Sequence, residues 1–271
     1  MKFFKVYLPV CILLPLFLIS CSDDSILNLY SLSDEYTLGV QMDSQIVANT
    51  SEYPILNNTY ATSYVRGILD TILLSGKVNY TSNFNNYNIR IINDDSTVNA
   101  FAIPGGFVYV YTGLLKFADN KAELAAVIAH EVGHCACRHS TKSMTKQYGI
   151  DFLLSAVLGS NPSALETLGS NLFSNLGLLY YSREDETEAD ECSFNYMLET
   201  PWYAGGMTYF FTKLQAEGDS TSSVFQTLLS THPNTADRLK AINKLIEKNN
   251  IPAPTEATLL TNDYNNFKAS L

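Results

Sequence analysis

Three of the four histidines in this chain lie within a stretch of ten residues, and two of them have a spacing that suits metal chemistry. His130 and His134 enclose Glu131 in the pattern H-E-x-x-H. On an α-helix, residues i and i+4 lie on the same face, so the two imidazole rings can bind one metal ion. Glu131 then lies where its carboxylate can take a proton from a water at the metal. The spacing predicts zinc-dependent hydrolysis.

The helix that must carry this motif is indicated by the sequence before it. Residues 120–129 are rich in Ala, Leu and Glu, which favour helix without any contribution from the motif. H-E-x-x-H is short enough to occur by chance, but a chain with four histidines makes that coincidence less frequent. Catalytic zinc usually has three protein ligands and an open fourth position, so a third ligand is expected elsewhere in the chain.

An acidic segment at residues 181–191 supplies the candidates for this third ligand. Glu186 and Asp190 are four residues apart, so on a helix they share a face. One of these carboxylates can bind the metal while the other accepts the second ring N–H of a ligand histidine. The alternative is a solvated acidic helix face, which a run of charges usually forms.

Together these motifs resemble a known peptidase family. H-E-x-G-H followed by R-H, and then Y-S-R-x-x-E-x-E-A-D, is similar to the zinc metallopeptidases of family 48, which include HtpX, the CAAX prenyl endopeptidases and the mitochondrial overlapping-activity protease. N-A-x-A-x-P-G-G at residues 99–106 and H-P at residues 232–233 extend the resemblance. It covers residues 35–246 and implies a zincin-like (gluzincin) metallopeptidase fold.

The resemblance also implies roles for individual residues. One Zn²⁺ per chain is expected to be held by His130, His134 and Glu186, while Asp190 orients a ligand histidine. Glu131 is expected to act as the general base of a zinc metalloendopeptidase.

Four further residues lie close enough to these motifs to need an interpretation. His232 is expected to be catalytic, as a donor to the oxyanion; alternatively it occupies the fourth position of zinc and holds the enzyme inactive, or it is a loop histidine before a proline. Arg238 and Arg183 are expected to pair with an acid or to support the oxyanion. His139 follows His134 by five residues, about 140° round a helix, so it should miss the metal and have a structural role.

A strand beside the metal is expected to bind the substrate. The resemblance places residues 99–103 there, where Asn99, Ala100, Phe101 and Ala102 would pair their backbone with an extended peptide. An ordinary core hairpin is the alternative interpretation. Because backbone pairing is largely indifferent to side chains, the expected substrates are unfolded or misfolded envelope proteins.

The hydrophobic periodicity predicts a mainly helical α+β domain. Apolar residues at helical spacing predict helices at residues 34–49, 59–74, 204–216 and 235–248, in addition to the helices of the two metal motifs. Alternating residues predict strands at 88–93, 98–103 and 107–111, which we expect to form a small antiparallel sheet beside the H-E-x-x-H helix. The expected metallopeptidase domain spans residues 33–248, and residues 249–271 are expected to be a C-terminal tail.

The N-terminal residues resemble an export signal. A basic start, an apolar run and a small residue occupy residues 1–20, and Leu18-Ile19-Ser20-Cys21 is similar to the bacterial lipobox, whose cysteine receives a lipid. A plain signal peptide with an incidental cysteine is the alternative. We expect residues 21–32 to tether the domain to a membrane through the lipid on Cys21. The expected location is the bacterial cell envelope, at the periplasmic face of the outer membrane, with the cell surface as the alternative.

Composition agrees with an exported enzyme and disfavours nucleic-acid binding. The chain has 17 basic and 27 acidic residues. Removal of residues 1–20 deletes two lysines and no acid, which makes the net charge more negative still. The remaining length suffices for one domain with a sizeable core, and the oligomeric state is open, a homo-oligomer included. Of the remaining cysteines, Cys192 can bridge to Cys137 or to Cys135, or all three are small buried residues.

Two functions remain after this reasoning. The first is a membrane-tethered zinc endopeptidase that hydrolyses unfolded or damaged envelope proteins. The second is an assembly chaperone or binding factor whose zinc site is repressed. Glu131 favours the enzyme, since a protein that only binds does not need a base beside the metal.

Overall fold

The computed structural model describes residues 28, 30–148, 181–217, 223–233 and 235–271. The helices are α1 (Leu32–Ala48), α2 (Thr59–Leu73), α3 (Thr112–Phe117), α4 (Lys121–Ala136), α5 (His139–Tyr148), α8 (Arg183–Met197), α9 (Met207–Ala216), α10 (Ser223–Thr231), α11 (Thr235–Lys248), α12 (Glu256–Leu259) and α13 (Thr261–Lys268). The strands are β1 (Asn88–Ile92), β2 (Ala100–Ile103) and β3 (Phe107–Tyr111). The predicted α+β, mainly helical class is confirmed.

The three strands form a mixed sheet with the order β1-β3-β2. β2 pairs antiparallel with β3, whereas β1 runs parallel to β3 with Asn88 opposite Phe107. The prediction of an antiparallel sheet was therefore wrong for β1. Alternation of apolar and polar residues specifies which face of a strand is buried, but it does not specify the direction of the strand's neighbour.

The tight turn between β2 and β3 depends on its two glycines. Gly105 has φ +80° and Gly106 has φ +85°, a region that other residues rarely adopt. Space is limited as well, because a Cβ on Gly106 would lie 2.8 Å from the Cβ of Phe84. The P-G-G sequence thus closes the hairpin between β2 and β3, and β2 is an edge strand of the described sheet.

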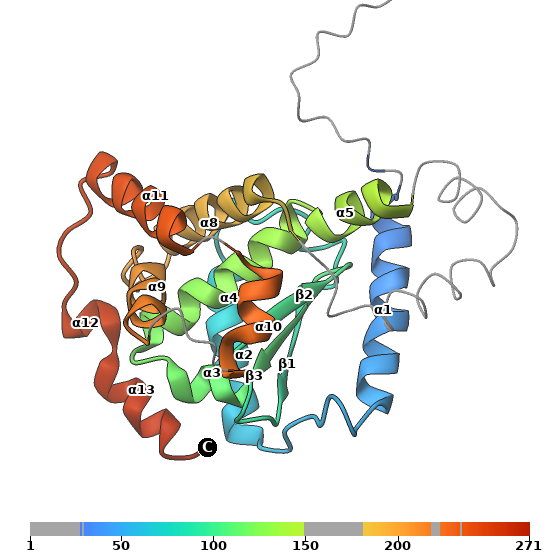
Figure 1. Cartoon of the computed structure of the whole chain (residues 1–271), viewed down its shortest axis with the longest axis horizontal. Helices are drawn as coiled ribbons and strands as arrows, with labels where there is room; N and C mark the ends of the chain where they lie inside the picture. The colour runs from blue at the N-terminus through green and yellow to red at the C-terminus, as the bar shows by residue number, and fades with distance from the viewer. Residues whose placement is uncertain (1–27, 29, 149–180, 218–222, 234) are drawn as a thin grey trace, which may run out of the picture.

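Helix α4 crosses the middle of the molecule, with the sheet on one side and α8 packed along it on another (Figure 1). The side chain of Asn120 caps its first turn by accepting from the N–H of Glu123 at 2.9 Å. All fifteen residues from Ala122 to Ala136 are buried. A helix buried on every side holds its side chains in fixed positions, which suits a helix that carries two candidate metal ligands.

The C-terminal residues 249–271 pack onto the same core. They contain α12 and α13, and the rings of Tyr264 and Phe267 are fully buried. The Tyr264 hydroxyl donates to the carbonyl oxygen of Leu115 at 2.6 Å. The segment interpreted as a tail is therefore part of the folded unit, because its two aromatic rings are spaced for one face of a short helix.

Within the described residues, no helix is both long and apolar enough to span a membrane. The predicted signal sequence and Cys21 lie outside the residues that the structure describes.

Candidate active site

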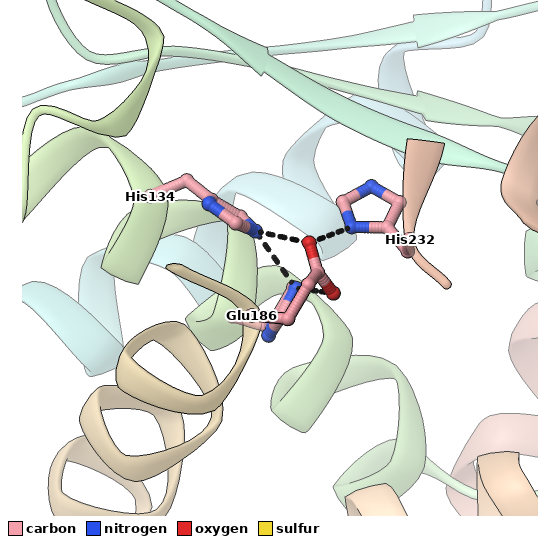
Figure 2. Close-up of side chains that lie close together, drawn as sticks. His134, Glu186 and His232 are labelled. Carbon is pink, nitrogen blue, oxygen red and sulfur yellow. Dashed lines mark hydrogen bonds and ion pairs between the residues drawn. The ribbon is translucent and has the colours of Figure 1, made fainter. Parts of the chain in front are cut away.

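Three separate segments place four side chains in one buried group. His130 and His134 come from α4, Glu186 from the first turn of α8, and His232 from the residue after α10. Figure 2 shows Glu186 between the rings of His134 and His232. Helix α8 begins at a capping box. The Ser182 hydroxyl oxygen accepts from the backbone N–H of Asp185, and the Asp185 carboxylate accepts from the backbone N–H of Ser182. This box fixes the start of the turn that carries Glu186.

The distances within this group are short. The Nε2 atoms of His130 and His134 are 3.0 Å apart, and Oε1 of Glu186 lies 3.3 Å from the Nε2 of His134. Nδ1 of His232 lies 3.0 Å from the same carboxylate oxygen. One ligand atom from each of the four residues lies within 4.8 Å of the others, and each side chain is at least 96% buried. Two imidazoles and one carboxylate, with a third imidazole beside them, are a donor set that fits zinc.

Asp190 and Arg238 form a second layer around this group. Asp190 Oδ1 lies 2.9 Å from Nδ1 of His130, the nitrogen that faces away from His134. Arg238 donates two hydrogen bonds of 2.7 Å to the Asp190 carboxylate and also pairs with Glu186. Asp190 is therefore placed to fix the orientation of His130, and Arg238 to fix that of Asp190.

His139 is placed differently from the sequence-based prediction. It is absent from the four-residue group, as expected, but its Nδ1 lies 2.9 Å from Nδ1 of His134. The 140° argument assumed one continuous helix, whereas α4 ends at Ala136 and Arg138 has φ +59°. The turn at Arg138 brings the next side chain back onto the end of α4. The R-H pair after the motif was the only sequence signal for this contact.

Comparison with known proteins agrees with this geometry. The model of peptidase family M48 matches residues 63–246. The chain belongs to this family. Metallopeptidases of family M48 use zinc, and the buried group of His130, His134, Glu186 and His232 is able to bind it.

Three relatives illustrate the range of M48 proteins to which the chain is similar. Metalloprotease LoiP of Escherichia coli is 32% identical over 224 residues, which cover 79% of this chain and 81% of LoiP. The putative beta-barrel assembly-enhancing protease of Vibrio cholerae is 28% identical, and the mitochondrial metalloendopeptidase OMA1 of Schizosaccharomyces pombe is 30% identical. The matches cover 69% and 59% of this chain but only 39% and 47% of those two longer proteins.

The M48 site keeps its two buried glutamates in opposite electrostatic conditions. Burial would raise the pKa of Glu186, but the charges of His232 and Arg238 outweigh burial and hold that pKa well below its usual value. Burial raises the pKa of Glu131, and His232 and His130 offset this only in part. Glu186 is therefore kept as a carboxylate that can bind a cation, while Glu131 is poised to hold a proton.

Burial and neighbouring charges also set the pKa values of Asp190, His134 and His232. Burial opposes ionisation of Asp190, yet Arg238 lowers the pKa of Asp190 to about 2. Burial lowers the pKa of His134 well below 6.5, so its ring is neutral as a metal ligand must be. The pKa of His232 is raised despite burial, because Glu186 and Glu131 face it.

Glu131 lies at the edge of the metal group and beside a cavity. Its Oε1 is 3.6 Å from Nε2 of His232, and its buried Oε2 has no hydrogen-bond partner among the described residues. The cavity is lined mainly by apolar side chains of α4, α9 and α10, together with Ala100 of β2. A buried oxygen without a partner, next to a cavity, is available to a water or a substrate.

Strand β2 lies next to this cavity, and in the part of the chain that the structure describes no further strand pairs with its outer edge. The carbonyl oxygen of Ala102 accepts a hydrogen bond of 3.3 Å from the Tyr181 hydroxyl, so it points away from β3. Alternate residues of an antiparallel strand point the same way, and Ala100 therefore shares this direction. Asn99 is buried and bonds β3 through its carbonyl, and Phe101 stacks on Tyr109 with ring centroids 4.7 Å apart.

One predicted residue, Arg183, lies outside the contacts of the metal group, whereas Tyr181, which was not predicted, contacts it. Arg183 is exposed at the start of α8 and borders a small cavity with Glu186 and Asp190, and no ion pair of its guanidinium occurs among the described residues. The sequence missed Tyr181, whose ring stacks on that of His134 at 3.9 Å between centroids.

The cysteines lie beside the site without joining it. Sγ of Cys137 is 3.4 Å from Sγ of Cys192, and both are free thiols. Cys135 points elsewhere, toward the carbonyl oxygen of Ile103 at 3.7 Å. Of the two bridges considered from sequence, the arrangement leaves only the one between Cys137 and Cys192 within reach.

Proposed function

We propose that this protein is a membrane-tethered zinc endopeptidase that hydrolyses unfolded or damaged proteins of the bacterial cell envelope. The observation that carries the proposal is the position of Glu131, a buried carboxylate that adjoins both the metal group and the cavity beside β2. A protein that used zinc only for stability would need the ligands alone. It would not need a buried base with a free oxygen beside a cavity.

His130, His134 and Glu186 would hold the zinc ion, which when bound polarises the scissile carbonyl and lowers the pKa of a water toward neutrality. Glu131 takes the proton of the attacking water and delivers it to the leaving nitrogen. Its raised pKa suits the first of these steps, because a carboxylate with a higher pKa is a stronger base toward the proton of the water. His232 donates from Nε2 to the carbonyl oxygen as negative charge develops there.

The substrate class follows from β2. An extended peptide that adds to the free edge of β2 would bond the backbone of Ala100 and Ala102 and cross in front of Glu131. Only unfolded or locally unfolded chains can present such a segment. The name of the beta-barrel assembly-enhancing relatives supports envelope proteins as the natural targets.

A second function is favoured by one observation. His232 belongs to the buried group of four, close enough to be a fourth metal ligand instead of a donor to the substrate. Four protein ligands would close the site, as in structural zinc centres. The protein would then bind or chaperone envelope proteins with its hydrolytic site repressed.

The decisive test compares the wild-type protein with Glu131→Gln on unfolded casein. Wild type should cleave the casein and lose this activity to a zinc chelator, while Glu131→Gln should bind zinc normally and cleave at a rate lower by several orders of magnitude. Undiminished cleavage by Glu131→Gln would rule out the mechanism. A wild type that binds zinc tightly but never cleaves would favour the repressed binding factor.

The tether requires a separate experiment. Replacement of Cys21 by Ser removes the thiol that would carry the lipid, so we expect the protein to move from the membrane fraction to the soluble fraction. Labelling with a radioactive fatty acid should mark wild type and not Cys21→Ser. Membrane association that survives the substitution would contradict a lipid anchor at this residue.

A further inference from the structure

His134 contacts the protein through both of its ring nitrogens. Nε2 faces the metal group, while Nδ1 lies 2.9 Å from Nδ1 of His139. Nε2 of His139 lies in turn 3.1 Å from a carboxylate oxygen of Glu188 on α8. The three side chains therefore form a chain of contacts from the metal group to the surface, where Glu188 is 53% exposed and His139 is fully buried.

The positions of the protons in this chain follow from the metal group. A neutral imidazole has one N–H, and a nitrogen that binds a metal cannot carry it. With Nε2 of His134 facing the metal, the proton of His134 is on Nδ1 and is donated to Nδ1 of His139. The proton of His139 then lies on Nε2, from which it is donated to Glu188. Each donor meets an acceptor, and the series ends on a carboxylate.

From this geometry we propose that His139, backed by Glu188, is a positioning residue that fixes the tautomer and ring orientation of the zinc ligand His134. The proposal rests on the zinc site proposed above. His139 does not belong to the metal group, and in this proposal it acts on the metal site through His134.

The two ligand histidines are supported in different ways. His130 bonds a buried carboxylate directly, since Oδ1 of Asp190 lies 2.9 Å from its Nδ1. On its Nδ1 side, His134 reaches a carboxylate through the ring of His139, and this carboxylate of Glu188 lies at the surface near Lys142, with 4.0 Å between Nζ and Oε2. A second buried carboxylate next to Glu131 and Glu186 would add negative charge at high cost, and a neutral ring avoids this.

The turn at Arg138 makes the arrangement possible. Its φ of +59° lies in the left-handed region, which costs energy for a residue with a side chain. Ion pairing of Arg138 with Glu35 at 2.5 Å, and a hydrogen bond to the carbonyl oxygen of Tyr30, stabilise the turn. The chain thus holds a strained residue in the one place where straightening it would remove His139 from His134.

Another use of the same atoms is chemically distinct. Cys137, His139 and Glu188 each offer a ligand atom within 4.8 Å of the others, a spacing that suits a second metal ion. An ion on Nε2 of His139 would displace the proton that this nitrogen donates to Glu188. The two arrangements therefore exclude each other, and the metal content of the protein distinguishes them.

The test measures the zinc affinity of the purified full-length protein by competition with a chromophoric chelator. His139→Leu removes the acceptor for the His134 N–H, and we expect it to weaken zinc binding by about 10–100-fold. His139→Asn places an amide oxygen near the position of Nδ1, so it should restore most of the affinity. Thr145→Val is the matched control, because Thr145 is a buried residue of the same helix whose hydroxyl, among the described residues, donates to the carbonyl oxygen of Thr141 and not to the His139 chain of contacts.

A spectroscopic measurement separates positioning from a loss of stability. The visible absorption of Co²⁺ bound in place of zinc depends on ligand geometry, so it should change in His139→Leu and stay the same in Thr145→Val. If His139→Leu does not fold, Glu188→Gln at the surface replaces it and should weaken zinc binding severalfold.

Unchanged zinc affinity and Co²⁺ absorption in His139→Leu, or in Glu188→Gln where it is the variant used, would overturn the proposal. So would equal losses in His139→Leu and His139→Asn, or two zinc ions per wild-type chain of which His139→Leu loses one. If the wild-type protein binds no zinc, the proposed function itself is refuted. If wild type binds zinc tightly and only the variant binds it weakly, the proposed function stands.

Discussion

The chemistry of this M48 protein depends at the residue scale on two glutamates of α4 and α8 with opposite properties. Glu186 is held ionised by Arg238 and His232, whereas the pKa of Glu131 is raised by burial. Residue type and burial do not account for the difference in pKa, because both residues are glutamates and both side chains are at least 98% buried. The difference arises because His232 and Arg238 approach Glu186 more closely, so Glu186 stays a carboxylate that can bind a cation while Glu131 can hold a proton.

The role of His232 is the residue-scale prediction with the clearest alternatives. Its Nε2 is buried without a hydrogen-bond partner among the described residues and lies 3.6 Å from Glu131. If it stabilises the oxyanion, His232→Leu should lower kcat on casein about 10²–10³-fold with little change in KM or zinc content. His232→Gln, which keeps a donor, should recover part of the loss. Higher activity in His232→Leu would identify His232 as an inhibitory ligand instead.

At the scale of elements, the site depends on how closely α8 approaches α4. A Cβ added to Gly133 would lie 3.0 Å from the carbonyl oxygen of Ala189 and 3.1 Å from the Cβ of Cys192. Gly133 therefore allows α4 and α8, the two helices that carry candidate ligands, to pack in contact. This explains a glycine inside α4, where alanine would otherwise be the better helix former.

The glycines of α4 and α2 give a matched pair of variants. Gly67→Ala meets no atom within 4 Å and should stabilise the protein by about 0.5–1 kcal/mol, because alanine favours helix. Gly133→Ala gains the same preference but must push α8 away, at a cost of about 1–3 kcal/mol. It should therefore be destabilised in urea unfolding of the metal-free protein and should bind zinc less tightly. Stabilisation by both substitutions would show that α4 and α8 are not in close contact at Gly133.

At the scale of the whole molecule, the first turn of α4 and the C-terminal helix α13 meet around a buried acid. Glu123 is fully buried and accepts the N–H of Asp119 at 2.8 Å. The pKa of Glu123 is raised from 4.5 to about 7, because the effect of burial outweighs that of the hydrogen bond from Asp119, which lowers the pKa. The nearby lysines, Lys213 and Lys268, bond backbone carbonyl oxygens of the α3 end instead of this carboxylate.

The raised pKa of Glu123 predicts that the stability of the folded protein depends on pH. Between pH 4.5 and 7 the folded protein holds a proton on Glu123 that the unfolded chain releases, so its contribution to stability falls as pH rises through this window. The difference between a pKa of 4.5 and one of about 7 corresponds to at most about 3 kcal/mol of the free energy of unfolding. Glu123→Gln should therefore equal wild type in urea unfolding near pH 4.5 and exceed it at pH 8. A difference that is the same at both pH values would contradict the raised pKa.

Much of the site was accessible from the sequence because its key spacings lie within single helices. The pairs His130 with His134 and Glu186 with Asp190 are each four residues apart, and helix geometry alone puts each pair on one face. The strand and helix limits agreed with the periodicity to within a few residues for most elements that were predicted. Short elements such as α3, α10 and α12 were missed, because one or two turns carry too little periodicity to detect.

Contacts between elements were decided only by the tertiary structure. The direction of β1, the burial of Tyr264 and Phe267, and the contact of His139 with His134 each depend on a turn or on packing against a distant segment. The sequence by itself indicated candidate zinc ligands, since the helical repeat fixes the relative directions of His130 and His134, and of Glu186 and Asp190. The tertiary structure determined what supports and surrounds them, because a left-handed residue at Arg138 or a close approach at Gly133 changes partners without changing any spacing in the sequence.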